Sequence, residues 1–335
     1  MEGLAEKAND MAEGLVDKAV ELLGGETAKT LNETKDRLGH LTEVLAVPQK
    51  QLRDLSATAG GMPTESADAA AQALKSFTDP MTTALSGDPS ALLPSGAACF
   101  GSCWANSVKN KLTAFSNEVG ELMKKVTGEN SVPNSAVQEL KSVKDSIDGA
   151  ARGLGNVSKV VEDTVDSLRS ASANMDKMQN LGQTLTDIEA NFGENLANAR
   201  GLLEAANTSV TNTPDSILNM VKTLADDVET FKMKAPQKIS RAFKPPTGLC
   251  CLGCGKVGSA QQGLEDGLNT ATSAVDLGPM IQGVEGIKES LKGLDLRPAT
   301  SALQTVEDQF KEILKPAKEV AEQAAMAVSA AKVEA

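Results

Sequence analysis

The chain has 335 residues, a formal net charge of −12, no tyrosine, one tryptophan, seven phenylalanines and one histidine. The acidic balance argues against nucleic acid as the main partner, because phosphate-binding surfaces need clustered lysine and arginine. The apolar residues are largely alanine, leucine and valine, which favour long helices with narrow cores over the aromatic-rich core of an α/β enzyme.

Residues 1–59 predict two helices. The first carries apolar residues at helical spacing from Leu4 to Leu22, and Gly24-Gly25 is expected to end it. The second has leucines seven residues apart, and Pro48 should kink or divide it because proline removes a backbone donor. These leucines are Leu31, Leu38, Leu45 and Leu52. No basic region precedes them, which argues against a DNA-binding zipper.

Residues 60–103 are rich in Gly, Pro, Ser, Thr and Ala, and we interpret them as a linker with short helices such as Ser66–Phe77. This segment ends with the first cysteine pair, Cys99 and Cys103. The second cysteine group, Cys250-Cys251-Leu252-Gly253-Cys254, follows about 150 residues later. The two groups hold all five cysteines of the chain, so they are the natural candidates for a specialised site.

Residues 104–234 predict a long helical region. Its first helix carries an apolar stripe from Val108 to Val126. The strongest signal of the chain follows, an a/d stripe between Val137 and Leu203 that is typical of a coiled coil. Its a/d positions are Leu140, Val143, Ile147, Ala150, Leu154, Val157, Val161, Thr164, Leu168, Ala171, Met175 and Met178.

Three details of this region carry expectations about its helices. The stripe slips by three residues after Met178, which we expect to overwind the helix rather than end it. Gly153 and Gly155 are the expected points of a bend or break. Pro133, with Ser135 and Gln138 behind it, predicts a capped start. A further helix is expected to open at Thr213-Pro214.

Residues 235–256 are interpreted as a basic loop rich in Pro and Cys, and residues 257–335 as C-terminal helices. A basic patch without an intervening acid surrounds the second cysteine group, and its simplest interpretation is a solvated basic loop. The patch consists of Lys232, Lys234, Lys238, Arg241, Lys244 and Lys256. Helical periods dominate throughout, so the sequence predicts an all-α fold: an elongated helical bundle with coiled-coil-like long helices and two cysteine-containing loops.

The cysteines admit three specific chemistries beside simple packing of small apolar residues. Cys251 and Cys254, in a Cys-x-x-Cys turn followed by Gly255, are typical of a zinc ligand pair, which Cys99 and Cys103 would complete. All five cysteines, Cys250 included, are also candidates for S-acylation, because apolar neighbours and the basic patch would support a membrane anchor. A redox pair is the third hypothesis, which a reducing compartment disfavours.

The sequence offers few groups for catalysis. His40, on the polar side of its helix, is interpreted as a solvated imidazole, and no phosphate loop, nucleophile elbow or zinc-protease motif occurs. We therefore expect no enzyme and no cofactor, with zinc as the one metal candidate. The function predicted is that of a structural scaffold subunit acting through helix–helix contacts with protein partners, itself included.

Two alternatives remain, a peripheral membrane protein anchored by acylated cysteines and a helical protein with cysteine-bound zinc or a redox pair. The acidic start lacks the pattern of a secretory signal, and no run of roughly 18 to 20 apolar residues occurs. A cytoplasmic location, within a large complex or at a membrane surface, is expected.

Overall fold

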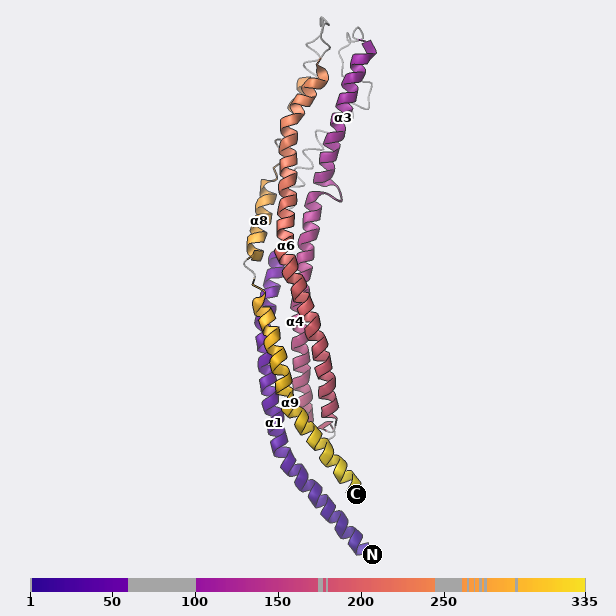
Figure 1. The fold of residues 1–335 in the computed structure, drawn as a ribbon, viewed down its shortest axis with the longest axis vertical. Helices are drawn as coiled ribbons and strands as arrows, with labels where there is room; N and C mark the ends of the chain where they lie inside the picture. Colours follow the sequence, from indigo (N-terminus) through magenta and orange to yellow (C-terminus); the bar gives the residue numbers. More distant parts are fainter. Residues whose placement is uncertain are drawn as a thin grey trace. The chain divides into compact units, whose positions relative to one another are not determined.

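The computed structural model describes the backbone of residues 2–59, 101–173, 177–178, 180–244, 261–263, 265–267, 269–270, 273, 276–292 and 295–334. It describes the side chains of the same residues except 2–24, 58–59, 101–105, 173 and 327–334. The helices are α1 (Glu2–Ala59), α3 (Gly101–Thr127), α4 (Val132–Ala173), α6 (Leu181–Phe243), α8 (Gly278–Lys292) and α9 (Arg297–Glu334) (Figure 1). The all-α prediction is confirmed for these described ranges, several of whose helices are long and packed against one another.

The chain divides into two packing units. The first unit comprises Met1–Ala57, Val143–Ser209 and Leu294–Ala335, and the second comprises Thr58–Ser142 and Val210–Gly293. The first unit therefore contains most of α1, α4 and α9 with the first part of α6, and the second contains α3, α8, the start of α4 and the rest of α6.

In the first unit, neighbouring helices run antiparallel. Gly153 of α4 lies against Ala199 of α6, whereas Ser146 contacts Ser209, so residue numbers rise along one helix as they fall along the other. The same relation holds between α6 and α9, where Arg200 pairs with Glu307 at 2.5 Å and Gly182 lies near Ala321. Helix α1 joins α4 through Gln49 Nε2, which donates to the carbonyl of Ala151 at 3.3 Å.

The core of the first unit is a set of heptad stripes. On α4 the buried positions include Val143, Ile147, Ala150, Leu154, Val157, Val161, Leu168 and Ala171. Thr164, the one polar position of that stripe, is fully buried and donates through Oγ1 to the carbonyl of Val160 at 2.7 Å. The hydroxyl is thereby satisfied within its own helix, which explains how a threonine fits an apolar stripe.

In the second unit, α3 packs against the last part of α6. One cluster joins Val108, Leu112, Phe115 and Val119 of α3 to Ala235, Ile239, Ala242 and Phe243 of α6. A neighbouring cluster joins Leu122 and Val126 to Leu224, Val228 and Leu277. Helix α8 buries Met280, Val284, Ile287 and Leu291, which recur at helical spacing.

The register slip after Met178 marks a chain reversal, contrary to the prediction of one overwound helix. Helix α4 ends at Ala173 and α6 begins at Leu181. The two stripes then face each other, because the helices are antiparallel and pack along their small residues. Gly153 and Gly155 lie inside α4, so the break expected at these glycines is absent from this helix. Folding back at the slip gives each stripe a partner, which one continuous helix would not provide.

Two other predicted helix boundaries are also wrong, and Pro48 does not divide its helix. Helix α1 continues through Gly24-Gly25 and Pro48 to Ala59 as one element. Helix α6 passes through Thr213-Pro214 without a new start and contains Pro236 as well. An interior glycine costs only about 1 kcal/mol and a proline about 3 kcal/mol. The buried residues on both sides of Pro48 and of Pro214 outweigh that cost.

The start of α4 is capped, but by a different serine from the one predicted. The backbone N–H of Asn134 donates to Ser131 Oγ at 3.4 Å, which makes Ser131 the N-cap in place of Ser135. Ser131 is 1 % exposed, and its own N–H donates to the carbonyl of Gly128 at 2.8 Å. Hydrogen bonds between its own polar groups thus stabilise the turn between α3 and α4.

Candidate functional site

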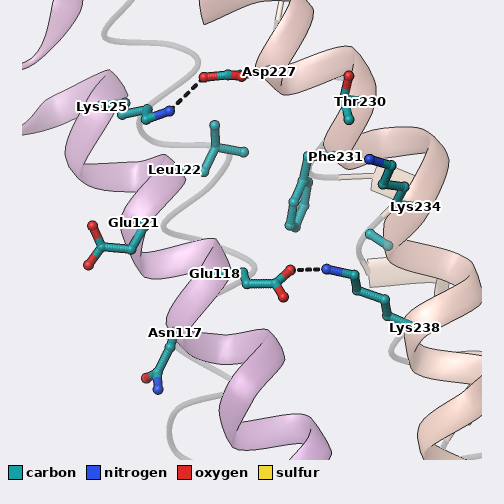
Figure 2. Close-up of a pocket in the computed structure, with 11 residues that line it drawn as sticks. Asn117, Glu118, Glu121, Leu122, Lys125, Asp227, Thr230, Phe231, Lys234 and Lys238 are labelled. Atoms are coloured by element: carbon teal, nitrogen blue, oxygen red, sulfur yellow. Dashed lines mark hydrogen bonds and ion pairs between the residues drawn. The ribbon is translucent and has the colours of Figure 1, made fainter.

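The candidate site is a groove of about 440 Å³ between α3 and α6 in the second unit (Figure 2). Helix α3 contributes residues spaced three and four apart on one face, and α6 contributes the facing residues. The lining residues are Asn117, Glu118, Glu121, Leu122, Lys125, Asp227, Thr230, Phe231, Lys234, Ala235 and Lys238.

The apolar part of the groove is the edge of the unit's core. Phe231 stacks on Phe115 with ring centroids 5.6 Å apart and an interplanar angle of 12°. Phe115 is buried at 3 % exposure, whereas Phe231 is only partly buried and faces the groove with Leu122. The groove therefore presents a partly exposed aromatic face above a buried one.

Two ion pairs join the helices across the groove, as the dashed lines in Figure 2 show. Lys125 Nζ lies 2.6 Å from Asp227 Oδ2, and Lys238 pairs with Glu118. The four side chains are between 40 % and 56 % exposed, so each pair contributes little stability, about 0 to 1 kcal/mol. Their effect is mainly to set the register of α3 on α6.

The lining of the groove is balanced in charge. Its acids are Glu118, Glu121 and Asp227, and its bases are Lys125, Lys234 and Lys238. Glu121 also accepts from Lys124 on its own helix at 2.8 Å. An open, charge-balanced groove with a partly exposed aromatic residue is suited to contact with a polar or amphipathic surface.

The predicted basic patch falls mostly on helix α6. Residues 235–243, interpreted from the sequence as a loop, are helical, which is a correction. They are helical because Ala235, Ile239, Ala242 and Phe243 extend the apolar stripe of α6 into the core cluster with α3. Residue Lys244 follows the helix end, and Lys256 lies outside the described residues.

Two acids reduce the positive charge of this patch, one from the distant helix α3 and one just before the patch on α6. Lys238 pairs with Glu118 of α3, and Lys232 pairs with Glu229 at 2.8 Å. The carbonyl of Arg241 accepts from Lys111 Nζ at 3.3 Å. Lys234 lines the groove beside Phe231. Part of the patch is thus the α6 side of the groove.

The cysteine hypotheses stay predictions. Cys99, Cys250, Cys251 and Cys254 lie outside the described residues, and Cys103 is described only by its backbone in the first turn of α3. Zinc binding, S-acylation and a redox pair therefore have no geometry attached to them. Among the described side chains, no three of His, Cys, Asp and Glu come together as a metal site.

His40 lies on the exposed side of α1, as predicted, with its side chain 78 % exposed. Its Nδ1 is 3.4 Å from Glu43 Oε2. Both side chains are solvated, so we interpret the contact as a surface pair and not as an oriented general base.

Basic neighbours lower the pKa of three aspartates among the described residues. A hydrogen bond from Lys144, and then one from Ser56, hold the pKa of Asp148 below its usual value. The ammonium of Lys288 on α8 lowers the pKa of Asp215 on α6 in the same way, and Arg297 lowers that of Asp295. The Lys144–Asp148 pair lies within α4, the Asp215–Lys288 pair links α6 to α8, and Asp295 lies at the start of α9, so all three have a structural role.

Sequence reasoning missed the acidic half of the groove and the basic residue Lys125. Glu118 and Lys125 are seven residues apart on α3, and both flank the stripe that contains Leu122. This flanking heptad spacing is the signal of an interhelical ion pair and could have identified them. Their partners on α6 are some hundred residues away, so the pairing itself needed the fold.

Comparisons with protein-family models, curated proteins and solved structures returned no match to this chain. None of the helices that the structure describes is both long enough and apolar enough to span a bilayer.

Proposed function

We propose that this chain is a non-enzymatic scaffold subunit that takes part in a larger assembly through helix–helix contacts with other proteins. The observation that carries the proposal is the division of its helix faces. Among the described side chains, buried residues recur at heptad spacing on one face of α1, α4 and α6, whereas the remaining faces carry charged side chains with few large apolar ones. Such faces offer a partner helix both charge and shape to recognise.

The groove between α3 and α6 supports this proposal as a second surface of the same kind. Its partly buried Phe231 gives contact area, and its balanced ion pairs give orientation rather than affinity. The elongated bundle predicted from the sequence belongs to the proposal, and small-angle X-ray scattering of the full chain would measure it.

Isolation of the full chain from its own cells tests the proposal. A small affinity tag, mild lysis and native mass spectrometry would report the mass and composition of the assembly, with the tag on an unrelated acidic helical protein as the control. We expect a complex in constant stoichiometry, containing another protein, further copies of the chain, or both. A 34.8 kDa monomer without a stoichiometric partner would reject the scaffold function.

The membrane-surface alternative rests on the cysteines and the basic patch. The ion pairs of Lys232 and Lys238 reduce the charge that the patch would offer to anionic lipid. The same native mass measurement addresses this alternative, because S-acylation adds the mass of one or more fatty acyl chains. Unmodified thiols together with no binding to anionic vesicles would remove it.

A further inference from the structure

Helix α1 exposes two valines on a face that the first unit does not cover. Val44 is 37 % exposed and Val47, almost one turn further, is 63 % exposed. Among the described side chains of this unit, the only other large apolar group exposed to a similar degree is Met326 on α9. The buried stripe of α1, which contains Leu41, Leu45 and Leu52, points elsewhere.

The valines belong to a second heptad pattern, which we call the outer seam. Its a positions are Arg37, Val44 and Gln51, and its d positions are His40, Val47 and Asp54. All six residues are exposed. On an α-helix these positions form one narrow strip, because alternate steps of three and four residues keep to one side. The strip has the spacing of a coiled-coil contact, and its two valines are exposed.

We propose that the outer seam binds the same seam of a second copy of this chain, with the two α1 helices antiparallel about a two-fold axis between Val44 and Val47. In an antiparallel pair an a residue faces a d residue. Val44 then packs against Val47 of the second copy, and by symmetry Val47 packs against Val44. His40 and Gln51 face each other beyond them as a polar pair.

The charges along α1 select this partner and this direction. With the valines paired, Arg37 faces Asp54 of the second copy at the ends of the seam. Glu43 and Lys50, exposed beside the seam at equivalent flanking positions, also face each other across the axis. Each of these oppositely charged contacts occurs twice in the dimer, because an isologous interface repeats every contact.

A parallel pair would instead place Arg37 beside Arg37 and Asp54 beside Asp54, which opposes like charges. Asp54 also has an interaction within its own chain, so its pairing with Arg37 is expected to fix register rather than to add much affinity. The valines supply the attraction, since exposed ion pairs contribute little.

This inference deepens the proposed function and rests on it, because it names one partner of the scaffold and the surface used. The dimer is expected to be concentration-dependent, since two valines per chain form a small apolar contact. Sedimentation equilibrium of the purified full chain over a wide range of concentrations measures it. Circular dichroism confirms that each variant keeps its helices.

Four variants distinguish the outer seam from other contacts. Val47→Asp should weaken dimerisation by about tenfold or more, because it removes two apolar contacts and places a carboxylate in each. Glu43→Lys and Lys50→Glu should each weaken it about three- to tenfold, because each creates two like-charge contacts. The double variant restores opposite charges and should return to within about twofold of the native constant.

The results separate this inference from the proposed function. A dimer that Val47→Asp weakens and the double charge exchange restores supports both. A monomer at every concentration, a dimer insensitive to Val47→Asp, or a double variant as weak as the single ones overturns the outer seam. If such a monomer still co-purifies with a different protein in constant stoichiometry, the scaffold function stands and only the self-association fails.

Discussion

The α4–α6 contact of the first unit and the α3–α6 contact of the second use opposite kinds of residue. Gly153 lies so close to α6 that a Cβ at its position would be 3.0 Å from Ala199 Cα. At the other contact Leu122 and Phe231 face a groove of about 440 Å³ with ion pairs on its rim. Small residues let two backbones approach, whereas large ones hold them apart and leave space at the edge.

The aromatic pairs of the two units repeat this contrast. Phe192 and Phe310 stack in the first unit with centroids 3.8 Å apart, and both are fully buried. Phe115 and Phe231 stack at 5.6 Å in the second, with Phe231 partly exposed. Stacked phenylalanines thus fill the core of the first unit, whereas in the second unit they lie at the edge of a groove.

Truncation of these rings should show the largest difference between the units. Phe192→Ala is expected to cost about 3 to 5 kcal/mol, because it removes a buried ring and leaves a cavity. Phe231→Ala is expected to cost less than about 2 kcal/mol, since its ring is already partly in water. Urea unfolding followed by hydrogen-exchange mass spectrometry measures the stability of each unit separately, because each unit gives its own peptides.

Phe192→Leu serves as the control for the first variant, because it keeps most of the apolar volume and should lose less stability. Equal losses for Phe192→Ala and Phe231→Ala would contradict the contrast between a closed core and an open groove.

Glycine substitutions compare the two contacts more finely. Gly153→Ala should destabilise the first unit by about 1 to 3 kcal/mol, because the new methyl group would lie 3.0 Å from the backbone Cα of Ala199 on α6. Gly120→Ala on α3 has open space around it and should stabilise the second unit by about 0.5 to 1 kcal/mol through its helix propensity.

Gly193→Ala provides a control within the first unit, since no atom lies within 4 Å of its added Cβ. It should stabilise that unit as Gly120→Ala stabilises the other. If Gly153→Ala also stabilises the protein, the close approach of α4 and α6 is not what makes glycine necessary there.

The buried stripes were predictable because they depend on local period alone. Leu140, Ile147, Leu154 and Leu168 are all buried as predicted, and so are Leu38 and Leu45 of α1. A seven-residue spacing places side chains on one face whatever that face later contacts. The all-α class follows from the same signal.

The helix ends were less predictable, because they depend on contacts between distant segments. Pro214 and Gly24-Gly25 are breakers by local preference, and yet α6 and α1 continue through them. At Pro214 the buried stripe on both sides overrules that preference. The register slip after Met178 has no proline near it, and yet the chain reverses between α4 and α6. Only the pairing of the two stripes, which a linear sequence does not display, distinguishes a reversal from an overwound helix.

The groove was visible in sequence only as separate fragments. Lys234 and Lys238 were assigned to a basic patch and Leu122 to a stripe, whereas Glu118 and Asp227 were not singled out. Their meeting depends on the alignment of α3 with α6 across more than a hundred residues. Charge patterns become informative once that alignment is known.

Ion-pair coupling gives the smallest expected difference between the units. Lys238 and Glu118 at the groove are 42 % and 48 % exposed, whereas Lys318 and Glu189 in the first unit are 26 % and 34 % exposed. A double-mutant cycle with Lys238→Met and Glu118→Gln should give about 0.2 to 1 kcal/mol. The cycle with Lys318→Met and Glu189→Gln should give the larger value, because less water screens that pair.

Salt distinguishes a true ion pair from a change in packing. Raising the ionic strength from about 0.1 M to 1 M shortens the Debye length from about 10 Å to 3 Å. The coupling at the groove should therefore fall toward zero, while the less exposed Lys318–Glu189 coupling persists in part. A groove coupling that equals the other and resists salt would mean that Glu118 and Lys238 are shielded from water, and the α3–α6 groove would then be closed rather than open.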